Sequence, residues 1–435
     1  MTESLIAIAL LLALVFARVP IAFAMALVGG AGFAWLRGWD PAGAMIGAAV
    51  FETGLSYSLS VVPLFIFMGN VLAGSGIAQG LFAGADRLFG RMRGGLALAA
   101  VLSCGGFSAV SGSSLATAAT MSRVAMPPMR RFGYADSLAA GSIAAGGTLG
   151  ILIPPSVIMI IYGLLTESDI GKLFIAGLLP GAIGIVFYLI AVMVAVRIDP
   201  SLAPETGTSQ PMTRRDKIGV TGTLGLFLFI MVGIYGGFFT PIEAAGMGAI
   251  AALGLALAMR ALGWKSFVSA CRETVLASAM IFAIIIGAEI FSAFVNFAGL
   301  PDALVDLIYD AEVNPWTVIW IMVGIYLLMG CIFESLSMIL LTVPIFYPLI
   351  MALDFGLPPA EAAIWFGILA LVVVEVGMIT PPVGLNVFVI NAMSGGTPMR
   401  DTFAGVIPFL VSDVLRILAL VAFPGITLGL MRLLY

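Results

Sequence analysis

The sequence predicts an all-α polytopic membrane protein made of two similar halves inserted in opposite orientations. The first observation is composition: 61% of the 435 residues are hydrophobic and only 10% are charged, whereas a soluble chain carries about 25% charge. The second is that apolar runs recur along the whole length with short charged interruptions, so no sizeable soluble domain is left over. The third is an internal repeat.

The repeat is visible as five short motifs that each occur twice. A slowly drifting offset in five places predicts an internal duplication. It divides the chain into a first repeat at 1–198, a cytoplasmic linker at 199–217 and a second repeat at 218–435. The offsets are 221, 223, 226, 227 and 228 residues for the motif pairs that begin at Pro20 and Pro241, Gly76 and Gly299, Phe107 and Phe333, Gly150 and Gly377, and Ala176 and Ala404.

Each half contains five apolar segments that we expect to cross the membrane and one segment too broken to cross. An odd number of crossings per half forces opposite orientations, which is the inverted-repeat plan of secondary transporters. The first segment is shorter than the usual ~20 residues, but it is expected to be retained because no cleavage site leads into soluble sequence. The expected crossings are 4–17, 21–36, 61–80, 136–165 and 173–196, then 218–239, 242–259, 275–298, 362–392 and 403–430.

Basic residues predict the orientation, because positively charged loops stay in the cytoplasm. With the N-terminus outside, most of the 19 Lys and Arg residues fall on the inner side, and the acidic residues Asp302, Asp306 and Asp310 fall outside. Both termini are therefore expected in the periplasm or on the exterior.

Several function classes are excluded by what the sequence lacks. Histidine is absent, which removes histidine-based zinc sites, Ser-His-Asp catalysis and histidine proton relays. No phosphate-binding Gly-x4-Gly-Lys-Ser/Thr loop occurs. Uphill transport must then use an ion gradient, and a membrane-embedded enzyme remains only if Ser, Asp and Glu alone form its site.

Two apolar spans contain a Pro-Pro pair near the middle, at Pro154-Pro155 and Pro381-Pro382. Two successive prolines remove backbone donors and clash with the preceding turn, so they break a helix. At membrane depth, broken backbone persists only where it is buried in protein or lines a cavity, and its carbonyls are natural ligands for a dehydrated cation. We therefore expect broken helices at about 136–165 and 362–392; the alternative is a structural kink.

Upstream of each break lies a segment rich in small or hydroxyl residues, at 103–122 and 330–342. The first is flanked by Arg93 and Arg123, both on the predicted inner side, so it should enter and leave on one side as a re-entrant hairpin. The hairpins are expected at about 96–122 and 316–348. Hydroxyls at such a tip suit sodium and could hold a carboxylate; the alternative is close helix packing through small residues.

Three glutamates, Glu289, Glu334 and Glu375, lie within apolar segments and are site candidates because a buried charge is costly. Glu334 and Glu375 could instead be satisfied structural carboxylates. Asn386 and Asn391 follow the second break and could contact a polar substrate.

Three motifs together resemble a known family. They are Ser111-Gly112-Ser113-Ser114, Gly150-Ile151-Leu152-Ile153-Pro154-Pro155, and Glu375-x-Gly377-x-Ile379-Thr380-Pro381-Pro382-Val383-Gly384-x-Asn386. They are similar to the large membrane subunit of TRAP transporters, the tripartite ATP-independent periplasmic class. The resemblance implies an elevator fold with scaffold and transport domains and sodium-coupled uptake of an organic acid such as a C4-dicarboxylate or sialic acid. It also implies a separate small four-helix membrane subunit and a periplasmic substrate-binding protein, with no nucleic-acid partner.

The resemblance also implies site residues, carried over motif by motif. One sodium ion is expected between the first hairpin and the first break, at Ser108, Ser111, Ser113, Gly150, Ile153 and Pro154. A second is expected between the second hairpin and the second break, at Gly330, Ser337, Gly377, Thr380 and Val383. Substrate is expected at Gly112, Ser114, Thr148, Pro155, Glu375, Pro382 and Asn386.

The competing interpretation is a stand-alone sodium/carboxylate symporter or antiporter of the wider ion transporter superfamily, which shares hairpins and breaks but needs no binding protein. The sequence does not name the organic acid.

Overall fold

The computed structural model describes residues 2–204 and 211–435, and these residues form α-helices and short 3-10 turns without any β-strand. The first half contains α1 Thr2–Phe16, α2 Ile21–Arg37, α3 Trp39–Leu55, α4 Val61–Gly74, α5 Ile77–Phe89, α6 Gly95–Ser111, α7 Ser114–Arg131, α8 Asp136–Thr148, α9 Val157–Leu165 and α10 Ile170–Ile198. The second contains α11 Arg214–Tyr235, α12 Pro241–Ala258, α13 Trp264–Phe297, α14 Leu300–Asp310, α15 Pro315–Gly330, α16 Ser335–Ala352, α17 Pro359–Gly377, α18 Leu385–Ser394, α19 Met399–Ala422 and α20 Gly425–Leu434.

The helices are those of a multi-pass membrane protein. Among the described residues, seven helices are long and apolar enough to cross a bilayer, or eight if the bent pair α3–α4 is counted as one span. Large apolar side chains are exposed on the outer helices, for example Phe51, Ile250 and Leu276. Such exposure is costly in water and expected in lipid. The all-α polytopic prediction is confirmed.

Local sequence explains where several helices begin. Thr213 and Asp216 form a capping box at the start of α11, and Thr240 and Glu243 form another at the start of α12. In each box the threonine oxygen accepts a backbone N–H that has no partner within the helix, while the acidic side chain accepts the N–H of the threonine. Pro241 occupies the first position of α12, where the missing N–H costs nothing.

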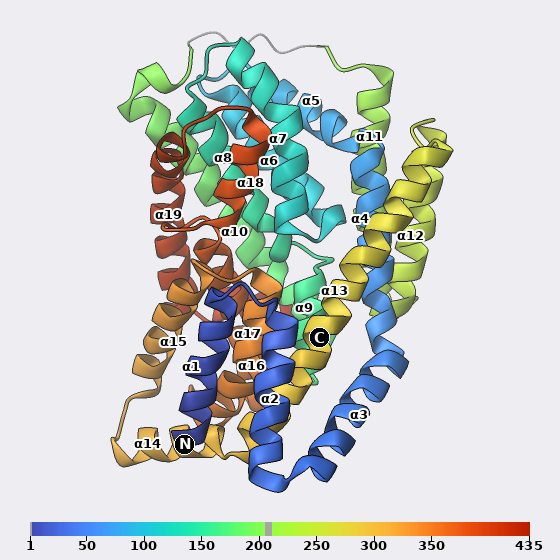
Figure 1. Cartoon of the computed structure of the whole chain (residues 1–435). Coiled ribbons are helices and arrows are strands. Elements are labelled where there is room, and N and C mark those ends of the chain that lie inside the picture. The colour runs from blue at the N-terminus through green and yellow to red at the C-terminus, as the bar shows by residue number, and fades with distance from the viewer. Residues whose placement is uncertain (1, 205–210) are drawn as a thin grey trace.

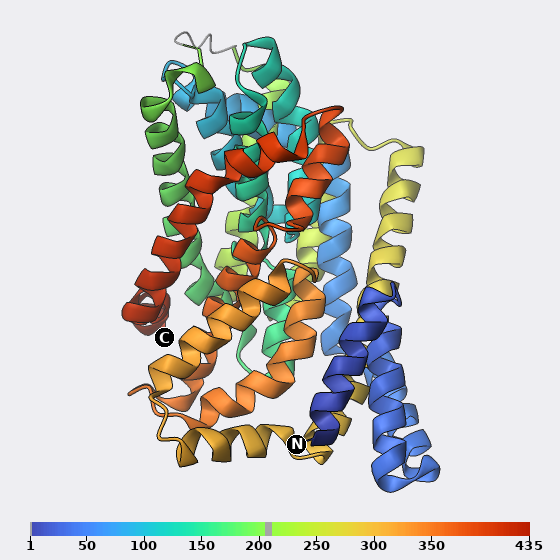
Figure 2. The same cartoon turned by 60° about the vertical axis from the view of Figure 1, so that its left-hand side comes forward.

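Two groups of helices stand side by side (Figures 1 and 2). One group consists of α6–α10 and α15–α20, and it contains both helical hairpins and both interrupted helices. The other contains α3, α4, α12 and α13, and α13 crosses the molecule obliquely from one end to the other. Helices α2 and α13 pack closely, since a Cβ placed on Gly29 would lie 2.6 Å from the Phe291 Cα.

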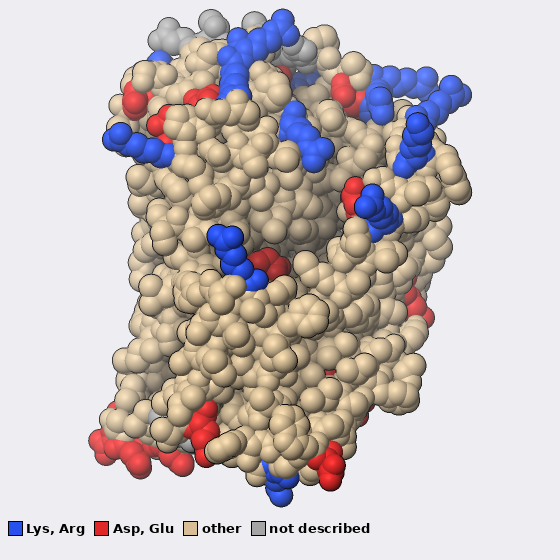
Figure 3. Space-filling view, viewed as in Figure 1, with Lys and Arg blue, Asp and Glu red and all other residues tan. Residues whose placement is uncertain are grey.

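The two ends of the molecule carry opposite charge (Figure 3). Basic side chains gather at the end formed by α5, α7, α11 and the start of α13, and acidic side chains gather at the end where α14 lies. The N-terminus also lies at the acidic end.

The structure corrects several expected boundaries in the first half. The third crossing was expected at 61–80, but α4 ends at Gly74 and a separate helix, α5, follows Gly76. Gly76 has a φ of +81°, a left-handed conformation that ends the helix and turns the chain. A further helix, α3, precedes α4, and the two are bent by 57° relative to each other.

Other boundaries also differ. The first hairpin was expected to end at 122, yet α7 continues through Pro127 and Pro128 to Arg131. The last crossing was expected to be continuous over 403–430, but the chain breaks at Phe423–Pro424 between α19 and α20. The linker expected at 199–217 ends earlier, because α11 already begins at Arg214; its residues 205–210 lie outside the described ranges.

Candidate functional site

The tip of the first hairpin is a tight turn of small residues between α6 and α7. Helix α6 ends at Ser111, Gly112 adopts a left-handed φ of +59°, and Ser113 caps α7 by accepting the N–H of Ala116. Glycine fits the left-handed position without a Cβ penalty, and serine is a preferred cap. We call Ser111–Ser114 the first tip.

The first tip lies against the interruption between α8 and α9, which we call the first break (residues 149–156). A Cβ placed on Gly112 would lie 2.8 Å from the Pro155 carbonyl oxygen, and one placed on Gly150 would lie 2.8 Å from the Ser113 carbonyl. Pro154-Pro155 is a cis peptide. The predicted residues Gly112, Ser113, Gly150 and Pro155 are therefore brought together, through backbone approaches that only glycine permits.

Hydroxyl groups line the end of α6 next to this contact. Ser111 Oγ is 2.7 Å from Thr117 Oγ1, so these two hydroxyls pair across the tip. Ser108 is fully buried, and its Oγ has no hydrogen-bond partner among the described residues. A buried hydroxyl without a partner is costly, and such an oxygen is available to a ligand.

The second hairpin meets the second interruption in the same way. We call 331–334 the second tip and 378–384 the second break. A Cβ placed on Gly330 would lie 2.7 Å from Gly377 Cα, and Cys331 Sγ is 3.2 Å from the Pro381 carbonyl oxygen. Pro381-Pro382 is also a cis peptide.

The polar groups of the second tip differ from those of the first. Glu334 caps α16 by accepting the N–H of Leu336 at 3.2 Å, and Ser337 Oγ donates to its other carboxylate oxygen at 3.1 Å. Thr380 Oγ1 donates to the Val376 carbonyl at 2.6 Å. The predicted ligands Ser337 and Thr380 therefore already donate their hydroxyl protons within the protein, whereas their oxygen lone pairs stay available.

The two breaks also differ in burial. Ile153, Pro154 and Pro155 of the first break are buried, whereas Pro382 of the second is exposed and Val383 is partly exposed. The first break is thus enclosed by protein, and the second opens outward.

A cavity of about 450 Å³, which we call the central cavity, lies between both hairpin tips and the neighbouring helices α4 and α13. Gly112 and Ser114 of the first tip line one side, Glu334 of the second tip lines another, and Asn70 of α4 faces them. The Asn70 amide donates to Thr274 of α13 at 3.1 Å, which fixes its orientation. Asn70 is a lining residue that sequence reasoning missed; a lone polar residue in the apolar segment 61–74 was the available signal.

Asn386 connects the second break to the first tip. Its amide donates to Ser114 Oγ at 2.8 Å and to the Ala144 carbonyl at 3.3 Å, while its own Oδ1 is buried without a partner in the described structure. This contact joins residues 272 positions apart. Asn386 thus lies beside the candidate site and not on the cavity wall.

Two predicted substrate residues lie elsewhere. Glu375 is fully buried and pairs with Arg416 at 3.0 Å, and Thr148 is fully buried 3.2 Å from the Tyr188 hydroxyl. Neither residue lines the central cavity. The geometry therefore favours the structural alternative for Glu375 over direct contact with a substrate in that cavity.

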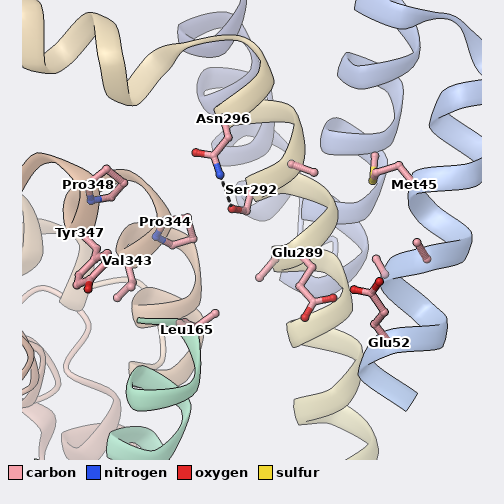
Figure 4. A pocket seen from close by; sticks show the side chains of 14 residues that line it. Met45, Glu52, Leu165, Glu289, Ser292, Asn296, Val343, Pro344, Tyr347 and Pro348 are labelled. Carbon is pink, nitrogen blue, oxygen red and sulfur yellow. Dashed lines mark hydrogen bonds between the residues drawn. The ribbon is translucent and has the colours of Figure 1, made fainter. Parts of the chain in front are cut away.

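A second cleft, of about 500 Å³, lies between α3 and α13 on one side and α9 and α16 on the other (Figure 4). Glu52 and Glu289 lie near each other on its α3–α13 wall, opposite Tyr347. Thr53 Oγ1 donates to Glu289 at 2.9 Å. Glu289, a candidate from the sequence, therefore lines a cleft at the boundary between the two helix groups.

Solved structures of transporters share this fold. The Alcanivorax borkumensis YdaH transporter aligns with a TM-score of 0.64 over 87% of each chain at 16% identity. Neisseria gonorrhoeae MtrF aligns with a TM-score of 0.53 over 87% of this chain and 83% of its own, at 13% identity.

Curated relatives are closer in sequence. A C4-dicarboxylate TRAP transporter large permease protein of Pseudomonas aeruginosa is 34% identical over 88% of each chain, and a sialic acid TRAP transporter large permease protein of Vibrio cholerae is 32% identical over 97% of each. An ectoine/5-hydroxyectoine TRAP transporter large permease protein of Ruegeria pomeroyi is 33% identical over 86% of each.

The family profile described as tripartite ATP-independent periplasmic transporter, DctM component, matches residues 8–426. This match and the identities above confirm the resemblance stated from the motifs, and the chain belongs to the DctM component family of tripartite ATP-independent periplasmic transporters.

Proposed function

We propose that this chain is the large permease of a transporter that imports an organic acid across the bacterial inner membrane, driven by a sodium gradient. The observation that carries the proposal is the central cavity, which is bordered by two hairpin tips that each touch a broken helix. Broken helices in the membrane interior commonly bind substrates and coupling ions.

The donor groups around the first break suit sodium. Ser108 has a buried oxygen without a partner among the described residues, and Ser111 and Ser113 bring two more hydroxyls to the tip. Backbone carbonyls freed at Gly150, Ile153 and Pro154 would complete an all-oxygen shell. Half-helix ends and unwound carbonyls are a recurrent sodium environment in transporters.

A carboxylate fits beside this ion at the N-terminal end of α7. Ser113, Ser114, Leu115 and Ala116 line the central cavity there. The first N–H groups of a helix have no partners within it, and together with the helix dipole they attract anions. The organic acid is expected to place one carboxylate at the first tip.

The inverted repeat and the elevator mechanism are part of the same proposal. The two halves share the order hairpin, broken helix, long helix, and Gly76 and Gly299 are left-handed caps before corresponding short helices. The central cavity and the second cleft, which Glu52 and Glu289 line, both lie between the helix group that contains the two hairpins and the group that contains α3, α4 and α13. A sliding movement along this boundary would expose the cavity to alternate sides.

The partners and the orientation are part of the same proposal, and the family and the charge distribution support them. A small membrane subunit and a periplasmic substrate-binding protein would complete the transporter. The basic end would face the cytoplasm, and the acidic end, where the N-terminus lies, would face the periplasm. The C-terminus is expected on the periplasmic side as well.

Uptake in reconstituted vesicles tests the proposal. Vesicles that contain this chain with its small subunit should accumulate substrate only with an inward sodium gradient and the loaded binding protein, and ATP should have no effect. Undiminished uptake after sodium is replaced by potassium would refute sodium coupling. Full uptake by the chain alone would favour the stand-alone symporter.

A further inference from the structure

A continuous chain of buried polar side chains joins four helices behind the central cavity. We call it the buried polar chain; its members are Thr148 of α8, Tyr188 of α10, Asp413 and Arg416 of α19, and Glu375 of α17. All five are at most 1% exposed. Thr148 and Tyr188 hydroxyls are 3.2 Å apart, Tyr188 donates to Asp413 at 2.8 Å, Arg416 contacts Asp413 at 2.9 Å, and Arg416 contacts Glu375 at 3.0 Å.

The two ends of the buried polar chain lie next to the two breaks. Thr148 is two residues before Gly150, which touches the first tip, and Glu375 is two residues before Gly377, which touches Gly330 of the second hairpin. The backbone amide of Leu152, inside the first break, also approaches the Glu375 carboxylate. The chain therefore runs between residues that adjoin the two breaks, and none of its members lines the central cavity.

Packing alone does not explain these residues. Well-packed apolar side chains in place of a buried ion pair are often as stable or more stable. Here the guanidinium fills the space left beside Gly184, where a Cβ would clash with Arg416. Glu375 Oε1 and two Arg416 nitrogens have no hydrogen-bond partner among the described residues. Apolar side chains could fill this space without leaving buried nitrogen and oxygen atoms unpaired, so we expect these polar residues to have a role other than core packing.

The Thr148 hydroxyl at one end of the chain lies near two possible acceptors. The Thr148 hydroxyl lies 2.7 Å from the Ala145 carbonyl and 3.2 Å from the Tyr188 oxygen, and its single proton can serve only one of them at a time. Tyr188 commits its own proton to the Asp413 carboxylate. Thr148 therefore contacts Tyr188 at the start of the first break, and Tyr188 in turn contacts Asp413.

We propose that the buried polar chain fixes the position of the two breaks relative to each other, so that cation binding at one break favours cation binding at the other. Tyr188, Asp413, Arg416 and Glu375 are positioning residues in this scheme, since none lines the central cavity. This inference rests on the proposed sodium coupling.

Tyr188→Phe is the informative variant, because it cuts the chain at its centre while retaining charge, ring and volume. Tyr326→Phe is the matched control. Tyr326 is also buried and also hydrogen-bonds a threonine, Thr342 at 2.8 Å, but within the second hairpin and outside the chain. Both variants would be purified with the small subunit, and melting temperature would be measured against sodium concentration, with choline replacing sodium to keep ionic strength constant.

Coupling between the two sites predicts a change in the shape of the curve of melting temperature against sodium concentration, which we call the sodium curve. With two linked sites the Hill coefficient lies between about 1 and 2. Tyr188→Phe should bring it close to 1 and raise the half-maximal sodium concentration about five-fold or more, whereas Tyr326→Phe should leave both values at wild type. A purely structural role would lower the melting temperature equally in sodium and in choline, without changing the curve, and would overturn the proposal.

A second variant keeps the test decisive. Glu375→Gln replaces the carboxyl group that Arg416 contacts at the end of the chain. The double variant with Tyr188→Phe should change the sodium curve less than the sum of the two single effects, because the connection is already cut. Additive effects would overturn the proposal. If the wild-type protein itself shows no sodium-specific stabilisation, the proposed sodium coupling fails instead, and the two failures remain distinguishable.

Discussion

Substitution of Gly112 by alanine tests whether the first tip must touch the first break. A Cβ at this position would lie 2.8 Å from the Pro155 carbonyl oxygen, a backbone atom that cannot rotate away. Overpacking of this kind costs about 1–3 kcal/mol. The φ of +59° adds about 1–2 kcal/mol for any residue with a Cβ. The total is about 2–5 kcal/mol, which would be relieved in part by separation of the tip from the break.

Gly133→Ala is the matched control for Gly112→Ala. Gly133 has a φ of +78°, and a Cβ there meets nothing within 4 Å, so it carries the conformational cost without the clash. In sodium, Gly112→Ala should melt roughly 1–5 °C below Gly133→Ala and should need more sodium for half-maximal uptake. Equal melting temperatures together with equal sodium dependence would show that the contact does not hold the site together.

Two further predictions concern the ion site and the orientation. Ser111→Ala removes one oxygen from the first tip, and loss of a hydrogen bond or ligand to a charged group costs roughly 1.5–3 kcal/mol. The sodium concentration for half-maximal uptake should therefore rise by about one to two orders of magnitude. Ser266→Ala, at an exposed position, is the control and should change this concentration little. If Ser111→Ala keeps the wild-type sodium dependence, the assignment of this serine as a ligand is wrong. In a background without native cysteines, single cysteines at Ser201 and Asp310 should react with an impermeant reagent from opposite sides of the membrane, the former from the cytoplasm. Labelling of both from one side would exclude the proposed orientation.

Local signals in the sequence were sufficient for the helical class and for the two interruptions at Pro154-Pro155 and Pro381-Pro382. Composition alone required a bilayer, and the pairs Pro154-Pro155 and Pro381-Pro382 marked interruptions because proline cannot continue the backbone hydrogen-bond pattern. Pro127-Pro128 shows that such a pair is not sufficient, since α7 continues through it. The bend between α3 and α4 and the separate helix α5 were missed. Gly76 was read as part of a repeated motif, but its left-handed conformation depends on the surrounding structure.

For the candidate site, the sequence identified many of the residues but not which of them are in contact. The duplicated motifs indicated that hairpins and breaks act together, and the structure places Gly112 against Pro155 and Gly330 against Gly377. The glutamates were ambiguous for a physical reason: a buried carboxylate looks the same in sequence whether it contacts a ligand or an arginine. Glu375 meets Arg416, 41 positions later, whereas Glu334 faces the central cavity.

The sequence by itself determined that the chain lies in a membrane, that it is helical and to which family it belongs, because hydrophobicity, helix-breaking residues and short motifs are properties of neighbouring residues. Only the tertiary structure decided which polar groups share a site. Asn386 reaches Ser114 across 272 positions, and Tyr188 reaches Asp413 across 225. Such pairs arise from the packing of helices against one another, and no local pattern in a single sequence specifies which buried polar group will satisfy another.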